Sequence, residues 1–297
     1  MYEYLNLSNN STSGSESYAA FYIAGCILNP VFSLTALIGN FFVLGAICTT
    51  PTLHKPTNIL LLGLSLSDLA VGLLVQPFFT VIVIFEVSQQ SYPGLSSIFR
   101  FIQAFFISAT ILTLTSVGVD RCLALILHLR YVVVVTVKKT ILLLCLIWVA
   151  SVVYAVTFLI DRELHRSVSF FVIALCIVMN ICTFSTIYRI CRRHQIQIQN
   201  QSLANQSEAF DMKRYRRSLI TMIVLLILLI ICYSPYICMR AVANFSDWPS
   251  SPQRKFMMRW SAFLVYLNSS INPLVYCWCL PSMRVAMKQF WKSLVHR

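Results

Sequence analysis

The sequence predicts an all-α membrane protein, a seven-transmembrane helix bundle followed by a short amphipathic eighth helix. Hydrophobic side chains make up 58% of the 297 residues and charged ones only 11%, whereas soluble domains average about 25% charged residues. A helix needs about 20 mostly apolar residues to cross a bilayer, and seven stretches reach that length. The strict alternation of a β-barrel strand is missing from them, and lipid offers no water to open backbone groups, so the spans are predicted to be helices.

The seven predicted spans follow one another with short connections. Six of them contain no charged residue, and the second contains only Asp68. In chain order they are Phe21–Cys48, Ile59–Phe85, Phe101–Val119, Thr140–Ile160, Ser167–Tyr188, Ser218–Met239 and Trp260–Met283. We therefore divide the chain into an extracellular N-terminal segment (1–20), a seven-helix domain (21–283) and an amphipathic helix with a short cytoplasmic tail (284–297).

The distribution of charge predicts the orientation. The chain has 23 Lys and Arg, 10 Asp and Glu, and a formal net charge of +13. Most basic residues fall in loops that face the cytoplasm if the N-terminus lies outside the cell, and the positive-inside rule favours that arrangement. The basic face indicates the cytoplasmic leaflet of the plasma membrane and no nucleic-acid partner. Asn6, Asn9 and Asn10 lie in acceptor sequons, so we expect glycosylation of the N-terminal segment.

Asp68 lies near the middle of the second predicted span. A carboxylate at this depth is costly and by default suggests a functional site. The candidate partners at similar depth in other spans are Asn40, Thr110, Asn268, Ser269 and Asn272. One carboxylate among neutral oxygen donors is suited to a small monovalent cation or a proton, and a hydrogen-bonded structural clamp is the alternative.

Prolines in the sixth and seventh predicted spans indicate bends. Pro235 and Pro273 each remove a backbone donor from a helix interior. Tyr233 lies close to Pro235, and Tyr276 follows Asn272 by one helical turn. A kinked helix with polar side chains on both sides of the kink has two feasible packings, as a conformational switch requires.

Asp120 and Arg121 follow the uncharged third span directly. At that depth the guanidinium of Arg121 can reach water, Asp120 or another helix. An arginine buried between helices without a partner is unfavourable, so its surroundings must differ between any two states of the bundle. Ordinary snorkelling of an interfacial arginine is the alternative.

The order of these motifs is more specific than any one of them. The set comprises "GN" at Gly39, "LSLSD" ending at Asp68, "DRC" from Asp120, Trp148, "CYSPY" from Cys232 and "NPLVY" from Asn272. Spread over seven spans, this set resembles the rhodopsin-like (class A) G-protein-coupled receptors, and the resemblance extends from about Phe21 to Leu294.

The resemblance implies a cell-surface receptor, and not an enzyme, that transduces an extracellular ligand into activation of a heterotrimeric G protein. Arg121 would leave Asp120 on activation and meet the C-terminal peptide of the G-protein α subunit. Tyr188 and Tyr276 would meet near it when the sixth helix swings outward. A sodium ion, the only cofactor expected, would favour the inactive state. Its ligands would be Asp68, Thr110, Asn268 and Ser269.

Several positions depart from the family pattern. Ser96 stands where most members have a bridged cysteine, Asn180 replaces the proline of the fifth span, and the second outer loop (161–166) is very short. These departures resemble the melanocortin, lysosphingolipid, cannabinoid and adenosine branch. Tyr233 replaces the family's switch tryptophan. Tyr215 stands where many members have an acid that restrains the arginine, so high basal activity is expected.

The ligand pocket is predicted at the outer half of the bundle. Its candidate lining residues are Gln76, Phe79, Arg100, Gln103, Tyr236, Arg240, Phe263 and Tyr266. Gln103 replaces the aspartate of amine receptors, which disfavours a monoamine, and the last span has no lysine for retinal. Two cations without an acid favour an anionic or neutral polar ligand, with or without a lipid tail, over a cationic peptide. The alternative is that Arg100 and Arg240 simply face water.

The C-terminal stretch has the pattern of an interfacial helix. Its apolar stripe comprises Met287, Phe290, Trp291 and Leu294, and a second face carries Arg284, Lys288 and Lys292. Such a helix lies on the membrane lipid. The stretch offers only Ser293 for phosphorylation, so arrestin recruitment is expected to depend on Ser202, Ser207 or Ser218 in or beside the third inner loop.

The alternatives to a signalling receptor are a transporter, a membrane hydrolase and a decoy receptor. A transporter also uses a midplane acid and broken helices, but it normally shows repeated halves, which this chain lacks. A membrane hydrolase needs intramembrane histidines, whereas all five histidines fall in loops or the tail. A decoy receptor that binds ligand without coupling remains an alternative that the sequence alone leaves open.

Overall fold

The computed structural model describes residues 2–295 except 89, 91, 201–205 and 246–250, and these described residues form helices and short links without a strand. The elements in chain order are α1 (Tyr2–Thr49), η1 (Pro51–Leu53), α2 (Pro56–Ala70), η2 (Val71–Val75), α3 (Gln76–Val87), α4 (Pro93–Leu127), η3 (His128–Arg130), α5 (Tyr131–Val134), α6 (Val137–Ile160), α7 (Arg162–Asn200), α8 (Gln206–Phe245), α9 (Pro252–Cys279) and α10 (Pro281–Val295).

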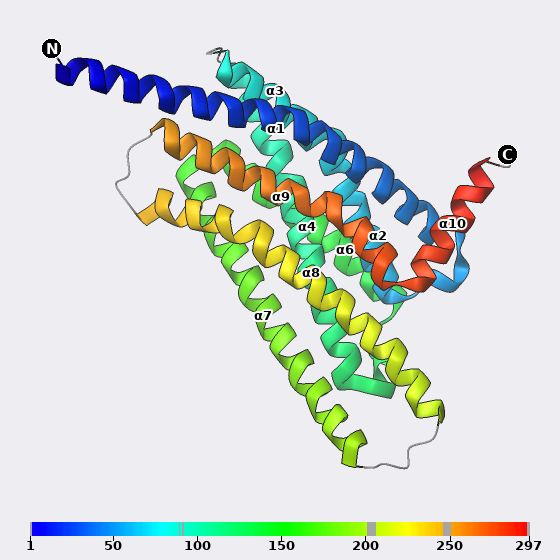
Figure 1. Cartoon of the computed structure of the whole chain (residues 1–297). Helices are drawn as coiled ribbons and strands as arrows, with labels where there is room; N and C mark the ends of the chain where they lie inside the picture. Colours follow the sequence, from blue (N-terminus) through cyan, green and yellow to red (C-terminus); the bar gives the residue numbers. More distant parts are fainter. Residues whose placement is uncertain (1, 89, 91, 201–205, 246–250, 296–297) are drawn as a thin grey trace.

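The described helices confirm the predicted seven-helix membrane bundle. Six continuous spans are long and apolar enough to cross a bilayer: Ala24–Thr49, Pro56–Glu86, Pro93–Val134, Val137–Ile160, Arg162–Ile190 and Ile223–Ala243. The seventh passes the same test only together with the helix that follows it, as Gln253–Cys279 plus Pro281–Val295, and the two are bent by 105°. In Figure 1, α10 accordingly turns away from the end of α9.

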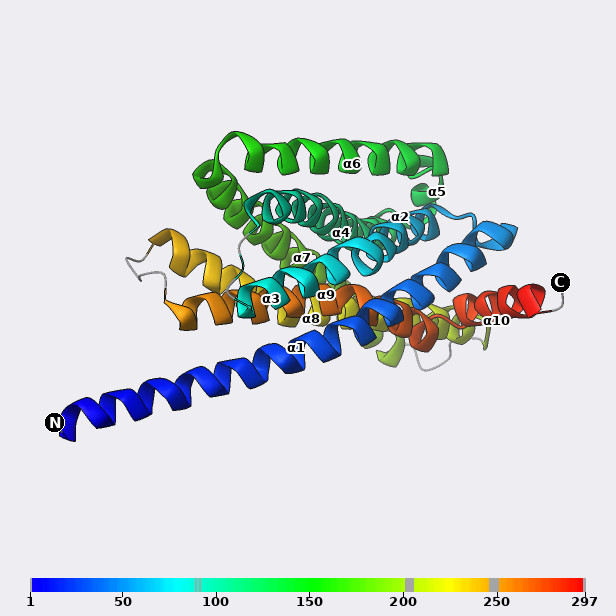
Figure 2. The same ribbon diagram turned by 90° about the horizontal axis from the view of Figure 1, so that it is seen from above.

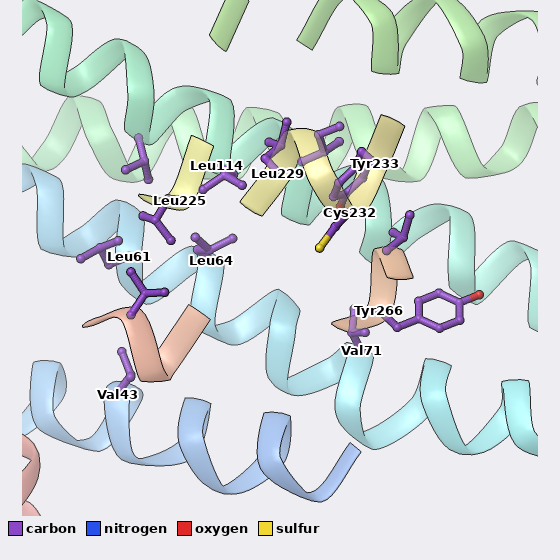
Figure 3. Close-up of a cluster of buried hydrophobic side chains, with 14 of the residues drawn as sticks. Val43, Leu61, Leu64, Val71, Leu114, Leu225, Leu229, Cys232, Tyr233 and Tyr266 are labelled. Atoms are coloured by element: carbon purple, nitrogen blue, oxygen red, sulfur yellow. The ribbon is translucent and has the colours of Figure 1, made fainter. Parts of the chain in front are cut away.

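α4 lies at the centre of the bundle. It contacts α2, α6 and α7, while α1 contacts α2, α3 and α9, and α8 packs on α7 and α9. Figure 2 shows α6 and α1 on opposite sides of the bundle, with α5 and α10 at the same end. Between the helices, Leu64, Leu114, Leu225 and Leu229 form part of one buried cluster with Tyr233 (Figure 3).

Three predicted boundaries differ from the structure. The seventh helix ends at Cys279 and the amphipathic helix begins at Pro281, ahead of the predicted boundary at 283, because a proline cannot continue a helix but suits its first turn. α4 begins at Pro93, so it includes polar residues that an apolar window excludes. The predicted outer loop (161–166) shrinks to Asp161, whose Oδ1 accepts a 2.8 Å hydrogen bond from the Glu163 backbone and starts α7 there.

The second span changes register at η2, a π-helical turn. Pro77 follows this turn and has no N–H to donate. α1 supplies side-chain donors to this segment: Ser33 Oγ donates to the Gly72 carbonyl at 2.6 Å, and Asn29 Nδ2 donates to the Gln76 carbonyl at 2.6 Å. The irregular backbone is therefore satisfied within the protein, as a lipid-embedded segment requires.

α10 docks on α1 through aromatic side chains. The Phe290 ring lies 5.8 Å from Phe41 and 6.0 Å from Phe42, centroid to centroid. Gly45 makes this contact feasible, because a Cβ there would lie 2.1 Å from the Phe290 ring. The predicted stripe thus packs partly against α1, while the basic face of Arg284, Lys288 and Lys292 is exposed.

Candidate functional site

Two ends of the bundle carry the candidate groups. We call the end that holds Arg121 and α5 the Arg121 end, and the end that holds Arg100 and the α6–α7 link the cavity end. The Asp68 cluster lies between them.

Asp68 is fully buried and takes hydrogen bonds from two other helices. Its Oδ1 accepts from Ser269 Oγ at 2.7 Å and from Thr110 Oγ1 at 3.3 Å, and its Oδ2 accepts from Asn272 Nδ2 at 2.7 Å. Asn40 does not reach the carboxylate and instead donates to the Ser269 carbonyl at 3.1 Å. The structure therefore brings together the carboxylate of α2 with the predicted donors of α4 and α9.

Polar atoms without a hydrogen-bond partner accumulate around this cluster. Among the described residues, both amide atoms of Asn268, Oδ1 of Asn272 and the hydroxyls of Tyr233 and Tyr276 are buried and unpaired. Buried polar groups are normally paired, and a cluster of unpaired ones is suited to holding a water molecule or an ion. One carboxylate with hydroxyl and amide oxygens is the ligand type that hard cations prefer, so Asp68, Thr110, Asn268 and Ser269 fit a sodium ion.

At the Arg121 end, Arg121 is paired with the acid beside it. Its Nη2 donates to Asp120 Oδ2 at 2.7 Å and its Nε donates to the same oxygen at 3.2 Å. Asp120 also accepts from Thr57 Oγ1 at 2.8 Å, on Oδ2, and from the Tyr131 hydroxyl at 2.7 Å, on Oδ1. Thr57 and Tyr131, which the sequence did not identify, thus hold the carboxylate from α2 and α5.

The predicted switch residues differ in burial. Tyr276 is fully buried, whereas Tyr188 is 54% exposed on α7, where its ring stacks on Phe184 with 6.3 Å between the centroids. Tyr233 is buried in the core, within the same helix as Pro235 and only two residues before it. Pro273 packs against α1, where a Cβ on Gly39 would lie 2.8 Å from its ring.

Asn180 occupies the position where the family pattern has a proline. Its Nδ2 donates to Thr115 Oγ1 of α4 at 2.9 Å and to the Cys176 carbonyl at 2.7 Å. α7 therefore runs without a proline kink here and is tied to α4 by a side-chain hydrogen bond. The side chains of Tyr215 and of its basic neighbours Lys213, Arg214, Arg216 and Arg217 lie outside the described residues, as do those of Asn6, Asn9 and Asn10.

A cavity of about 660 Å³ opens at the cavity end between α4, α6, α7, α8 and α9. Of the predicted pocket residues, Arg100, Gln103, Tyr236 and Arg240 line it. The others do not: Phe79 and Phe263 line a separate small cavity against α1, and Gln76 and Tyr266 are fully buried. Gln103 Nε2 donates to the Tyr266 hydroxyl at 2.7 Å, which closes the floor between α4 and α9.

The cavity lining carries a large excess of positive charge. Its basic residues are Arg100, Arg162, Arg166, Arg240, Arg254, Lys255 and Arg259, and its acids are Glu86 and Glu163. Both acids are already paired, Glu86 with Arg259 and Glu163 with Arg166. Arg100, Arg162, Arg240 and Lys255 have no acidic partner in the part of the chain that the structure describes. Sequence reasoning named only Arg100 and Arg240, each next to an apolar window. Arg259 borders a window in the same way, but nothing in the sequence shows that it faces the cavity.

Aromatic rings hold several of these cations. The guanidinium carbons of Arg100 and Arg162 each lie 5.8 Å from the centroid of Phe158, and that of Arg240 lies 5.0 Å from the Tyr236 ring. The Nη2 and Nε of Arg240 also donate to the Tyr236 hydroxyl at 2.6 and 3.0 Å. These contacts fix guanidinium groups from three helices around one space.

The family model described as "7 transmembrane receptor (rhodopsin family)" matches residues 39–169 and 162–276, which is most of the chain. The chain belongs to the rhodopsin family of seven-transmembrane receptors. The predicted family is thereby confirmed: the protein is a G-protein-coupled cell-surface receptor, and not an enzyme. It is a multi-pass membrane protein.

The similar proteins include receptors that are named for different ligands. The receptor is 27% identical to trace amine-associated receptor 5 of Mus musculus, covering 86% of this chain and 81% of the relative. It is 24% identical to adenosine receptor A2b of Gallus gallus over 87% of this chain and 85% of the relative. Octopamine receptor beta-1R of Drosophila melanogaster is 21% identical over 97% of this chain and 65% of the relative. The adenosine receptor belongs to the branch that the sequence resembles.

Proposed function

We propose that this receptor recognises an anionic extracellular ligand in the cavity and signals to a heterotrimeric G protein through Arg121. The N-terminus would lie outside the cell and the Arg121 end in the cytoplasm of a plasma-membrane receptor. The observation that supports this ligand class is the cation excess of the lining, in which both acids are already paired.

Uncompensated cations in a partly enclosed site attract a counter-charge. Coulomb energies grow as the surroundings exclude water, and a cleft of one sign concentrates ligands of the other sign. Arginine adds geometry, because its fork of donors matches carboxylate, sulfate and phosphate oxygens. A cationic amine would meet repulsion from Arg100 and Arg240 and would find Gln103 in place of an acid. Amine recognition, which the names of several relatives suggest, is therefore disfavoured.

α8 offers the route from ligand to coupling surface. Arg240 and Tyr236 line the cavity. In the same helix, Pro235 adjoins Tyr236, and the buried Tyr233 precedes Tyr236 by three residues. A ligand that pulls Arg240 toward α4 changes the bend at Pro235, and the other half of α8 then moves away from the bundle. Loss of packing at the Arg121 end frees Arg121 from Asp120 for the G protein.

Three further assignments complete the proposal. A sodium ion held by Asp68, Thr110, Asn268 and Ser269 would stabilise the inactive arrangement. α10 would lie on the cytoplasmic leaflet, with its exposed basic face toward anionic membrane lipid. Arrestin recruitment would depend on phosphorylation of the third inner loop, where Ser202 and Ser207 lie outside the residues whose side chains are described.

The test is guanine-nucleotide exchange by added G protein on the receptor in phospholipid vesicles. A panel of carboxylates, sulfates and phosphates should raise exchange, and a matched panel of amines should not. Arg240→Gln should weaken the response to anions about tenfold, the effect of losing one charge-assisted hydrogen bond, whereas Arg284→Gln on α10 should leave it unchanged. Activation by amines or basic peptides alone would overturn the ligand class. A decoy receptor would bind anions without any exchange.

A further inference from the structure

The unpaired cations of the cavity lie at two depths. Arg100 precedes the floor residue Gln103 by three residues, about one helical turn, and Arg240 lines the same cavity from α8. On α9, Lys255 precedes the floor residue Tyr266 by eleven residues, or about 16 Å along the helix. Arg162 begins α7 beside the link to α6 and lies at the mouth. The positive charge is therefore spread along the cavity.

These cations repel one another. Arg100 shares the cavity lining with Arg162, Arg240 and Arg259, and like charges in one partly enclosed space repel one another. Glu86 is already bound by Arg259, which donates to it through Nε at 2.9 Å and also through Nη2. A ligand with one negative charge can compensate only one guanidinium group, and the remaining cations of the cavity still repel one another. Compensation at both depths requires at least two anionic groups in one molecule.

The cations are also held in place before a ligand arrives. The Phe158 ring contacts the guanidinium groups of Arg100 from α4 and Arg162 from α7. The Tyr236 hydroxyl holds that of Arg240 on α8. A pre-organised set of donors lowers the entropy lost on binding, and it does so most for a ligand that engages several of them together.

We propose that the cavity binds one organic ligand with two or more anionic groups, one bound between Arg100 and Arg240 and another toward Arg162 and Lys255. This inference rests on the proposed anionic ligand class and specifies its valence. Carboxylate, sulfate and phosphate groups share the required chemistry. A second anionic group makes its contacts intramolecularly, so affinity rises without any change in the first contact.

The experiment compares 1,3-propanedisulfonate with 1-propanesulfonate, which have the same anionic group and stay ionised at any working pH. Binding to the full-length receptor in nanodiscs is measured by calorimetry at constant ionic strength. The disulfonate should bind about 100-fold more tightly, as expected when two linked contacts fit their spacing. Arg100→Gln and Arg162→Gln should each bring the ratio of the two affinities toward one, while Arg100→Lys and the distant Arg284→Gln should preserve most of it.

The outcomes separate this inference from the proposed function. Equal affinity for the two sulfonates, with both bound, overturns the multivalent ligand and leaves the anionic ligand class standing. Absence of binding by either probe, in a receptor whose unfolding temperature shows it to be folded, overturns both. An affinity ratio that Arg100→Gln and Arg162→Gln leave unchanged also overturns the inference, because the second group would then bind elsewhere.

Discussion

At the Arg121 end, Arg121 is paired with Asp120, and two further side chains hold that carboxylate. At the cavity end, Arg100 and Arg240 have aromatic neighbours but no acidic partner in the described residues. Arg121 must lose its contact with Asp120 before it can bind another group. Arg100 and Arg240 can bind an anionic group without first losing an acidic partner. In the proposed mechanism, activation by a ligand would compensate charge at the cavity end and release Arg121 from Asp120 at the other end.

The largest effect is expected from Arg121→Ala. Removing the guanidinium takes away the group that the G protein would meet, so exchange should fall about 100-fold, near the upper range of coupling between two sites. Ligand binding and surface expression should stay within twofold, since Arg121 is 21% exposed and far from the cavity lining. Exchange at the normal rate from this variant would remove Arg121 from the coupling mechanism.

Tyr131→Phe should have the next largest effect, and in the opposite direction. The change deletes the 2.7 Å hydrogen bond to Asp120, and a hydrogen bond to a charged group contributes about 1.5 kcal/mol or more. Ligand-free exchange should therefore rise about tenfold. Thr57→Val removes the other partner and should act in the same direction, whereas Tyr92→Phe, an exposed tyrosine near the start of α4, is the control. A fall or no change in both variants would contradict the restraining role of these contacts.

Sodium should have a smaller effect, from the cluster between the two ends. Replacing potassium by sodium at constant ionic strength should reduce ligand-free exchange about fivefold, the lower range of an allosteric effect. In Asp68→Asn this dependence should vanish because the carboxylate is gone, while Glu86→Gln should retain it. Equal sodium sensitivity in Asp68→Asn and the unmodified receptor would place the ion elsewhere.

The smallest effect is expected from Glu86→Gln at the cavity end. The change frees Arg259 for the ligand, but Glu86 is 43% exposed, and exposed ion pairs contribute about 0–1 kcal/mol. Affinity for the disulfonate should rise about threefold at low salt and converge with that of the unmodified receptor at high salt. Glu163→Gln, whose carboxylate is 71% exposed, should change it less. Weaker binding in both variants would mean that the acids help to hold the ligand.

The transmembrane helices were predictable because lipid demands continuous apolar sequence over each span. That demand ends at the membrane surface, which is why the first turns of α4, before Phe101, and the helical start of α7 at Arg162 were not predicted. The seventh helix ends at Cys279 because Pro281 cannot continue it. A window that counts apolar residues does not detect this local signal.

The buried site was more predictable than the cavity. Asp68 and its donors could be matched because each is a rare polar residue at membrane depth, where few partners exist. Tyr131 and Thr57 could not, since nothing in the sequence shows that α5 folds back beneath Asp120. Phe79 and Phe263 were grouped with the cavity by depth alone, but they line a separate small cavity with residues of α1, a placement that depends on how the helices rotate in the bundle.

α6 and α7 are joined by Asp161 alone, so this connection contributes no lid over the mouth of the cavity. A ligand drawn in by the arginines meets no segment there that must open first, and its arrival should approach the rate limit set by electrostatic steering. Departure is equally unobstructed at this side. The residence time of the proposed ligand would then be set by its contacts with the arginines and not by the opening of a segment at this side.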